Sequence, residues 1–225
     1  EVVTKGLNPN VEMKDSGVEW IGEIPSHWDS ISTKLVSEIV NGSTPKNNGE
    51  YWEGDIVWIT PSDIGPVKEK MFISNSKRKI TTEGLNSCGC DLCPKNSLIL
   101  TNRGPIGNVI ISKVDFTTNQ GCKVMIPKGN MNVKFLYYFF KISSDELNML
   151  GQGTTFLELS TSSLSMFKVT LPPIPEQQQI VEYLDEQTRL IDNTISIEEK
   201  RIELLKEYRQ SLISEVVTGK RKVVE

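Results

Sequence analysis

The chain has 225 residues, of which 37% are hydrophobic and 24% are charged, and its formal net charge is −4. This composition is typical of one sizeable globular core with some chain left over, whereas a second full domain would be cramped. No apolar run approaches the roughly 20 residues that cross a membrane and no charged-then-apolar leader is present, so we expect a cytoplasmic protein.

The acidity is unevenly distributed along the chain. Residues 1–175 hold 17 Lys/Arg against 18 Asp/Glu, whereas residues 176–225 hold 8 against 11. The net charge therefore does not exclude a nucleic-acid partner, because the first part can still present a basic face.

The first residues of the chain contain a repeat and an aromatic segment. Glu-Val-Val-Thr at residues 1–4 recurs at residues 215–218, an offset of nearly the whole chain, which suggests half of a tandem protein or a one-unit member of a family built from two units. Trp20 and Trp28 then bracket a glycine and a proline, which predicts an entry segment anchored by aromatic side chains. His27 is the only histidine and has no visible nucleophile to serve, so we expect a structural role for it.

The middle of the chain predicts short strands separated by polar loops. Runs rich in β-branched and aromatic residues predict strands at residues 55–60, 97–101, 109–111 and 123–126. The loops between them are polar and mostly rich in glycine, at residues 41–46, 61–63, 102–107 and 118–121. We expect functional side chains on these loops.

Helices return after residue 127. Asn132 is placed to cap a helix over Val133–Ile142, and Ser143 begins a capping-box pattern for a second helix that ends near Gly151. A polar loop at residues 151–155 follows, and residues 164–171 lead into a proline-rich stretch.

The most informative stretch is residues 172–219, which predicts one very long helix. The opening prolines suit a first helical turn, and no proline or glycine interrupts the pattern before Gly219. Such a helix would reach roughly 60 Å, which is longer than a domain of this size is wide, so we favour a coiled coil over an ordinary surface helix. With Val181 at heptad position a, the seam is formed by Val181, Leu184, Thr188, Ile191, Ile195, Glu198, Ile202, Leu205, Arg209, Leu212 and Val216.

A second apolar row lies on another side of this helix. It contains Tyr183, Leu190, Ile197 and Leu204, which repeat every seven residues. One partner helix would leave this row exposed to water, so we expect two contact surfaces. The sequence thus predicts an α+β fold with a globular domain at residues 1–171 and a long helix at residues 172–225.

Catalytic motifs are missing from the sequence. There is no phosphate-binding Gly-x-x-x-x-Gly-Lys loop, no dinucleotide fingerprint and no His-Glu-x-x-His, and Glu50, Glu53 and Asp55 are better explained by a solvated loop. We therefore expect a non-catalytic chain without a cofactor. The four cysteines, Cys88, Cys90, Cys93 and Cys122, lack the spacing of a closed zinc site, so we favour unligated thiols over structural zinc.

Binding chemistry is better supplied. Arg103, beside Asn102 at the end of an apolar strand, has the donors that read guanine or clamp phosphate, although pairing with a local carboxylate is the alternative. Lys77, Arg78 and Lys79 suit phosphate neutralisation, with a solvated turn as the alternative. Further groups suited to phosphate or base-edge contact are supplied by Ser43, Thr44, Lys46, Thr60, Ser62, Asn119, Gln120, Thr154 and Thr155.

Taken together, these segments resemble the specificity subunit of Type I restriction-modification enzymes. The resemblance covers almost the whole chain, and the order of its motifs is more specific than any one of them. The matching segments are E-W-I-G at 19–22, I-P-x-H-W at 24–28, G-S-T-P at 42–45, W-I-T-P-S-D-I at 58–64, R-G-x-I-G at 103–107, N-Q-G at 119–121, G-x-G-T-T at 151–155 and L-P-P-I-P-E-Q at 171–177.

The resemblance implies a role in reading DNA. Family members carry two target-recognition domains, each reading half of a split site, and long helices that pair antiparallel between them. Methyltransferase subunits dock on these helices and restriction subunits join through them, so catalysis belongs to other chains. The resemblance would assign helix pairing to Leu184, Ile191, Ile195, Ile202, Leu205 and Leu212, and methyltransferase docking to Tyr183, Leu190, Ile197 and Leu204.

This sequence holds one recognition domain and one long helix. It is either the distal half of a two-domain subunit, as the repeat favours, or a half-length subunit that forms a homodimer through antiparallel helices. A functional alternative from another class is a coiled-coil assembly adaptor that does not bind DNA. A stand-alone endonuclease is a weaker third alternative.

Overall fold

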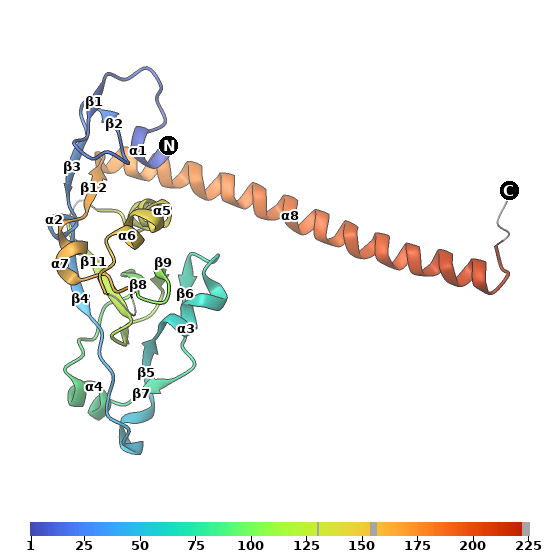
Figure 1. Cartoon of the computed structure of the whole chain (residues 1–225), viewed down its shortest axis with the longest axis horizontal. Helices are drawn as coiled ribbons and strands as arrows, with labels where there is room; N and C mark the ends of the chain where they lie inside the picture. Colours follow the sequence, from blue (N-terminus) through green and yellow to red (C-terminus); the bar gives the residue numbers. More distant parts are fainter. Residues whose placement is uncertain (130, 154–156, 222–225) are drawn as a thin grey trace. The chain divides into compact units, whose positions relative to one another are not determined.

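The computed structural model describes residues 1–129, 131–153 and 157–221, and the chain divides into two units at residues 1–181 and 182–225. Figure 1 shows the elements in chain order. The first unit mixes short strands and helices, and the long C-terminal helix follows, so the predicted α+β class is confirmed. No helix among the described residues is both long enough and apolar enough to span a membrane.

The largest sheet has five strands in the order β4-β11-β8-β9-β6. All pairs are antiparallel except the parallel pair of β6 and β9. The central strands are almost continuous apolar runs because both of their faces are buried. The bounds are β4 (Ser37–Asn41), β6 (Phe72–Ile73), β8 (Leu98–Asn102), β9 (Ile106–Ser112) and β11 (Cys122–Pro127).

A three-stranded sheet shares its core with the first. Its central strand β5 (Trp52–Ile59) pairs in parallel with β10 (Phe116–Thr118) and antiparallel with β7 (Lys79–Ile80). Ile59 and Phe116 of this sheet belong to the same buried cluster as Ile99 and Val124 of the larger sheet. The two sheets therefore form one hydrophobic core rather than two domains.

The four predicted strands are confirmed as β5, β8, β9 and β11, whereas one predicted loop is wrong. Residues 61–63 belong to a short helix, α3 (Pro61–Ile64). Proline suits its first turn, and the Asp63 carboxylate accepts the Thr60 N–H at 2.9 Å, which stabilises the start of the helix.

Helices α5 (Val133–Ile142) and α6 (Ser144–Met149) pack against β9. The predicted cap of α5 is confirmed, because the Asn132 side chain accepts the N–H groups of Lys134 and Phe135. The capping box predicted at Ser143 is wrong. Ser143 is fully buried at the junction of the two helices, and its hydroxyl donates to the Phe139 carbonyl at 2.7 Å instead.

The remaining helices of the first unit are short. Their bounds are α1 (Val2–Lys5), α2 (Thr33–Val36), α4 (Thr82–Cys88) and α7 (Thr161–Met166), with 3₁₀ turns at Gly49–Tyr51 and Gly65–Val67.

The entry segment packs through its aromatic side chains, as predicted. Trp28 is fully buried, and Trp20 contacts the rings of Phe139 and Phe167 at centroid distances of 5.6 and 5.9 Å. Two small antiparallel sheets accompany it, one of β1 (Met13–Asp15) with β2 (Glu23–Pro25) and one of β3 (Asp29–Ser32) with β12 (Lys168–Leu171).

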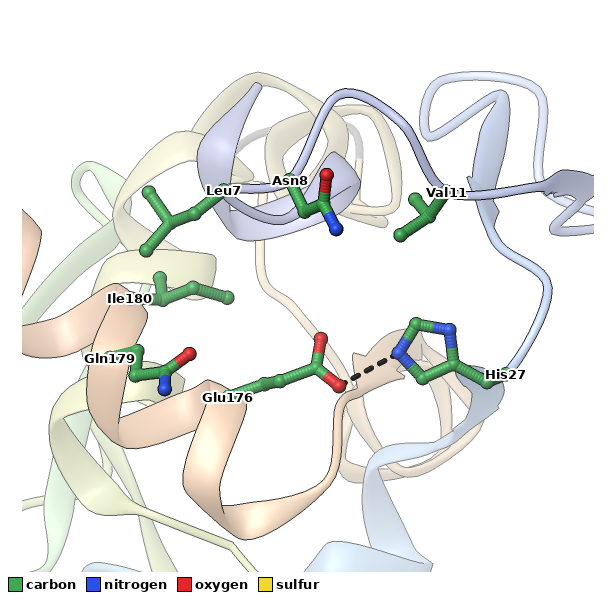
Figure 2. A pocket seen from close by; sticks show the side chains of 7 residues that line it. All are labelled: Leu7, Asn8, Val11, His27, Glu176, Gln179 and Ile180. Atoms are coloured by element: carbon green, nitrogen blue, oxygen red, sulfur yellow. Dashed lines mark hydrogen bonds and ion pairs between the residues drawn. The ribbon is translucent and has the colours of Figure 1, made fainter.

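Helix α8 (Ile174–Val217) begins within the first unit, where Glu176 joins it to the entry segment. Its carboxylate lies 2.7 Å from His27 Nε2 and accepts the Trp28 indole N–H at 2.9 Å. Figure 2 shows Glu176 directed at His27 across a pocket that is also lined by Leu7 and Ile180. This contact supports the structural role predicted for His27.

The second unit contains the rest of α8. The predicted long helix is confirmed within two residues at each end. Its apolar side chains are exposed, with solvent-accessible fractions between 43% and 64% for Tyr183, Leu190, Ile191, Ile195, Ile197, Ile202, Leu204 and Leu205. These side chains of both apolar rows therefore face solvent in the isolated chain, whereas Val181 at the start of the seam is buried and Leu184 and Leu212 are half-buried.

Candidate nucleic-acid interface

The topology gathers the polar loops at one end of the two sheets. The parallel strands β5 and β10 both end there, and the antiparallel strand β7 begins there. In the larger sheet, β4 and β8 end beside the start of β11, because Asn41 pairs with Lys123 and Thr101 pairs with Cys122. The loops at residues 41–46, 102–107 and 118–121 therefore lie close to α3 and to residues 76–78.

Asp63 ties two of these segments together. One carboxylate oxygen accepts the backbone N–H and the hydroxyl of Thr60, at 2.9 and 2.6 Å, and the other accepts the Lys77 N–H at 2.9 Å. The Ser62 hydroxyl lies 2.8 Å from the Thr60 hydroxyl and is exposed, whereas Thr60 itself is buried. Thr60 therefore supports the surface, and Ser62 presents a polar group on it.

We call the cavity beside Asp63 the Lys77 pocket. Its volume is about 560 Å³. Lys77 and Arg78 are exposed, and the Arg78 guanidinium lies 3.5 Å from the centroid of the Trp52 ring, whereas Lys79 is half-buried within β7. The lining residues are Trp58, Thr60, Pro61, Ser62, Asp63, Lys77, Arg78 and Asn119.

A second and larger cavity, which we call the Arg103 pocket, has a volume of about 800 Å³. Pro61 lines both cavities, so they adjoin. Among the described residues, no hydrogen bond or ion pair engages the half-buried Arg103 side chain. The lining residues are Pro61, Arg103, Gly104, Pro105, Ile106, Asn148, Leu157 and Glu158.

Asn102 lies beneath the surface rather than on it. Its side chain is fully buried, and its amide donates to Glu158 Oε1 at 2.9 Å. In this position Asn102 supports the Arg103 pocket from within the protein. The sequence predicts Asn102 on the loop beside Arg103, whereas the structure places it as the last residue of β8 with its side chain buried.

The loops at residues 41–46 and 118–121 contact each other. The Thr44 hydroxyl donates to Gln120 Oε1 at 2.5 Å, and the Trp58 indole donates to the Ser43 carbonyl at 3.0 Å. Gly42 is required here, because a Cβ atom would lie 2.1 Å from the Asn119 carbonyl oxygen. Lys46 is exposed at the edge of this pair of loops, while Thr154 and Thr155 lie outside the described residues.

The cysteines are buried thiols or lie close to them. Cys88 Sγ lies 3.0 Å from Cys90 Sγ, whereas Cys93 and Cys122 belong to the shared core. Burial raises the pKa of Cys90 to about 11 and that of Cys93 to about 12, and it also raises the pKa of Cys122. Over the described parts of the chain, no group of three His, Cys, Asp or Glu side chains is arranged to hold a metal ion.

Comparison with known proteins gives one consistent result. The family model for the Type I restriction modification DNA specificity domain matches residues 25–207. The chain is 41% identical over 176 residues to the MjaIX specificity subunit of Methanocaldococcus jannaschii, which covers 77% of this chain and 40% of that protein. It is 30% identical over 218 residues to the EcoR124I/EcoR124II specificity subunit of Escherichia coli, covering 91% and 50% respectively.

Solved structures share the fold. The HsdS subunit from Thermoanaerobacter tengcongensis superposes with a TM-score of 0.60 at 18% identity, over 80% of this chain and 41% of that chain. A chain from a structure described as the complex assembly and conformational transition of the type I R-M system gives a TM-score of 0.70 at 19% identity, over 90% and 48%. The chain thus spans about half the length, or less, of these relatives.

Proposed function

Because the chain belongs to the Type I restriction-modification DNA specificity family, we propose that it recognises one part of a bipartite double-stranded DNA target. The observation that carries the proposal is the pair of adjoining pockets around Pro61. They bring two basic side chains from separate loops, the exposed Lys77 and the half-buried Arg103, to one end of the sheets.

The proposed contacts fall into two classes. Lys77, Arg78 and Lys79 neutralise phosphates, and Arg103 reads a base edge from a loop that follows a buried strand. The short polar groups set the register of the duplex through phosphate and base-edge contacts. They are Ser43, Thr44, Lys46, Ser62, Asn119, Gln120, Thr154 and Thr155, with Thr60 and Asn102 as supports.

We assign protein contacts to the long helix. The seam through Leu184, Ile191, Ile195, Ile202, Leu205 and Leu212 pairs with a second helix, and the row through Tyr183, Leu190, Ile197 and Leu204 docks methyltransferase subunits. Restriction subunits join through the methyltransferase, and this chain has no catalytic role. The functional division is then recognition by residues 1–171 and assembly by residues 172–225, and the complex works in the cytoplasm.

Salt dependence tests the proposal. Binding of the chain and its methyltransferase partner to duplex DNA is measured between 50 and 200 mM salt, and several phosphate contacts predict a fall of roughly 10³-fold or more in affinity. The coiled-coil adaptor is the alternative, and the exposed apolar rows of α8 favour it. It predicts that this chain contributes no DNA binding to the complex, which would refute the proposal.

A further inference from the structure

Glu158 is an exposed carboxylate that the fold holds in a fixed position in the Arg103 pocket. Its Oε1 accepts the Asn102 amide at 2.9 Å. Its backbone exchanges two hydrogen bonds with Gln152, at 2.9 and 3.0 Å, and the next residue, Leu159, donates its N–H to the Asn102 carbonyl. The carboxylate is therefore fixed relative to the end of β8.

The side-chain amide of Asn102 makes the hydrogen bond to Glu158 but leaves its own oxygen without a partner among the described residues. The residue is fully buried, and its Oδ1 has no hydrogen-bond partner among the described residues. A buried polar atom without a partner costs stability, so packing alone does not explain an amide at this position. The contact that the structure gives this side chain is the hydrogen bond from its Nδ2 group to Glu158.

The Arg103 pocket thus contains two opposite charges, of which Glu158 is oriented by Asn102 at the end of β8. Within the described residues Arg103 and Glu158 form no ion pair with each other or with another group. The surfaces between them are largely apolar, formed by Pro61, Pro105, Ile106 and Leu157. Arg103 keeps its donors for a ligand, and Glu158 keeps the lone pairs that the Asn102 amide does not use.

A carboxylate beside DNA is repelled by phosphates. Lys123, with which Glu158 interacts electrostatically, offsets part of this repulsion, and a donor on a base edge would offset more of it. In the major groove, guanine presents the acceptors O6 and N7, which suit arginine. The cytosine of the same pair presents the N4 amino group, which suits a carboxylate. The charges in the pocket match these two groups.

We propose that Arg103 and Glu158 together read one G·C base pair, with Arg103 on the guanine and Glu158 on the cytosine amino group. Asn102 is the positioning residue for Glu158. The inference rests on the proposed DNA recognition and adds to it the identity of one base pair in the half-site.

The test compares the motifs that variants select. The chain is assembled with the methyltransferase of its own system and mixed with duplexes that carry a randomised segment. The duplexes that bind to the complex are sequenced, and their common motif is the readout. In Glu158→Gln the glutamine oxygen can still accept the hydrogen bond from the Asn102 amide. The glutamine side chain pairs best with adenine, whereas a carboxylate accepts from the cytosine amino group. We expect the preference for cytosine over adenine to fall by roughly 5- to 150-fold at one position of the motif, with the other positions unchanged.

Two further variants make the result specific. Glu23→Gln removes the same charge from β2, outside both pockets, and should leave the motif unchanged. Asn102→Asp places a like charge beside Glu158 and should relax the same position as Glu158→Gln. A uniform loss of affinity for all sequences with Asn102→Asp would make its role merely structural.

The outcomes separate the two proposals. If the unaltered complex selects a motif that Glu158→Gln also selects, the base-pair assignment is refuted while DNA recognition stands. A change of equal size at every position also refutes it, because Glu158 would then act only through its charge. If the unaltered complex selects no motif, the proposed function fails and the base-pair assignment fails with it.

Discussion

Asp63 is a buried carboxylate that joins two segments of the candidate interface. Its oxygens accept the N–H groups of Thr60 and Lys77, so the residue positions both α3 and the basic run. Asp63→Ala leaves these donors without their partner, and we expect the free energy of unfolding to fall by about 1–3 kcal/mol. Urea unfolding measures the change, with Asp55→Ala on the exposed part of β5 as the control. Equal stability of the two variants would contradict this role.

Arg103 is predicted to contribute sequence preference rather than stability. Its side chain has no partner among the described residues, so Arg103→Ala should leave thermal unfolding nearly unchanged. Binding to the cognate duplex should weaken by about 1–3 kcal/mol if it contacts a base edge. Fluorescence anisotropy against cognate and scrambled duplexes checks this. Arg189→Ala, which removes a helix arginine paired with Glu186, controls for charge.

Unchanged affinity and unchanged site preference would remove Arg103 from the interface. A uniform loss for cognate and scrambled DNA would instead assign it to phosphate contact. The two results distinguish base reading from charge neutralisation at this residue.

The cysteine group is predicted to be independent of metal. Burial raises the pKa of Cys90 to about 11 and that of Cys93 to about 12, and within the described parts of the chain no group of three His, Cys, Asp or Glu side chains is arranged to hold a metal ion. Treating the purified protein with a chelator should therefore leave its melting temperature unchanged. Differential scanning calorimetry with and without chelator tests this, and a fall of several degrees would restore the zinc hypothesis.

At the level of elements, we expect the two apolar rows of α8 to have different functions. Ile202→Ser with Leu205→Ser alters the seam, and Ile197→Ser with Leu204→Ser alters the second row. All four side chains are exposed in the isolated chain, so neither pair should destabilise the first unit. We expect the first pair to weaken helix pairing and the second to weaken methyltransferase binding.

Sedimentation measures pairing, and co-purification with the methyltransferase measures docking. Each double variant is the matched control for the other, because both replace two exposed aliphatic residues by serine. Loss of both activities in both variants would show that the rows form one surface.

The elements best predicted from sequence are those whose pattern is long. Helix α8 was predicted almost to its ends because its periodicity runs through 44 residues without a breaker. Strands β8 and β11 are apolar runs between turn signals and were predicted for the same reason. Two-residue strands such as β6 and β7 carry no periodicity, and partners elsewhere in the fold define them.

The sequence predicts individual residues of the candidate site, but it does not predict which of them lie close together in the folded chain. Parallel pairing of β5 with β10 brings Ser62 and Asn119 to one pocket, although 57 positions separate them in the sequence. Glu158 was missed, because a single glutamate beside a leucine carries no local pattern. Its hydrogen bond to Asn102 is visible only in the folded chain.

For the whole molecule, the repeated Glu-Val-Val-Thr segment is packed in one copy and exposed in the other. In α1, Val3 and Thr4 are buried, and the Val3 carbonyl accepts the Thr170 hydroxyl at 3.1 Å. At the end of α8, the side chains of Val216 and Val217 are exposed. Together with the apolar rows, this leaves the second unit with surfaces that a single chain does not cover.

We therefore predict that the chain alone forms a dimer through antiparallel α8 helices. Light scattering at micromolar concentration should give twice the mass of the single chain, which is 25.3 kDa. Thr188, Glu198 and Arg209 interrupt the seam and would set its register at some cost in stability. A strict monomer would refute the prediction.

A two-fold dimer also constrains the DNA target. Two identical recognition domains related by a two-fold axis read the same half-site on opposite strands, so the target should be a split palindrome. Pairing with a second, different half would instead give two unrelated half-sites. Mapping methylated sites in a genome that expresses the complete system distinguishes these outcomes. A motif with unlike halves would show that the antiparallel partner of α8 in the working complex is a different helix.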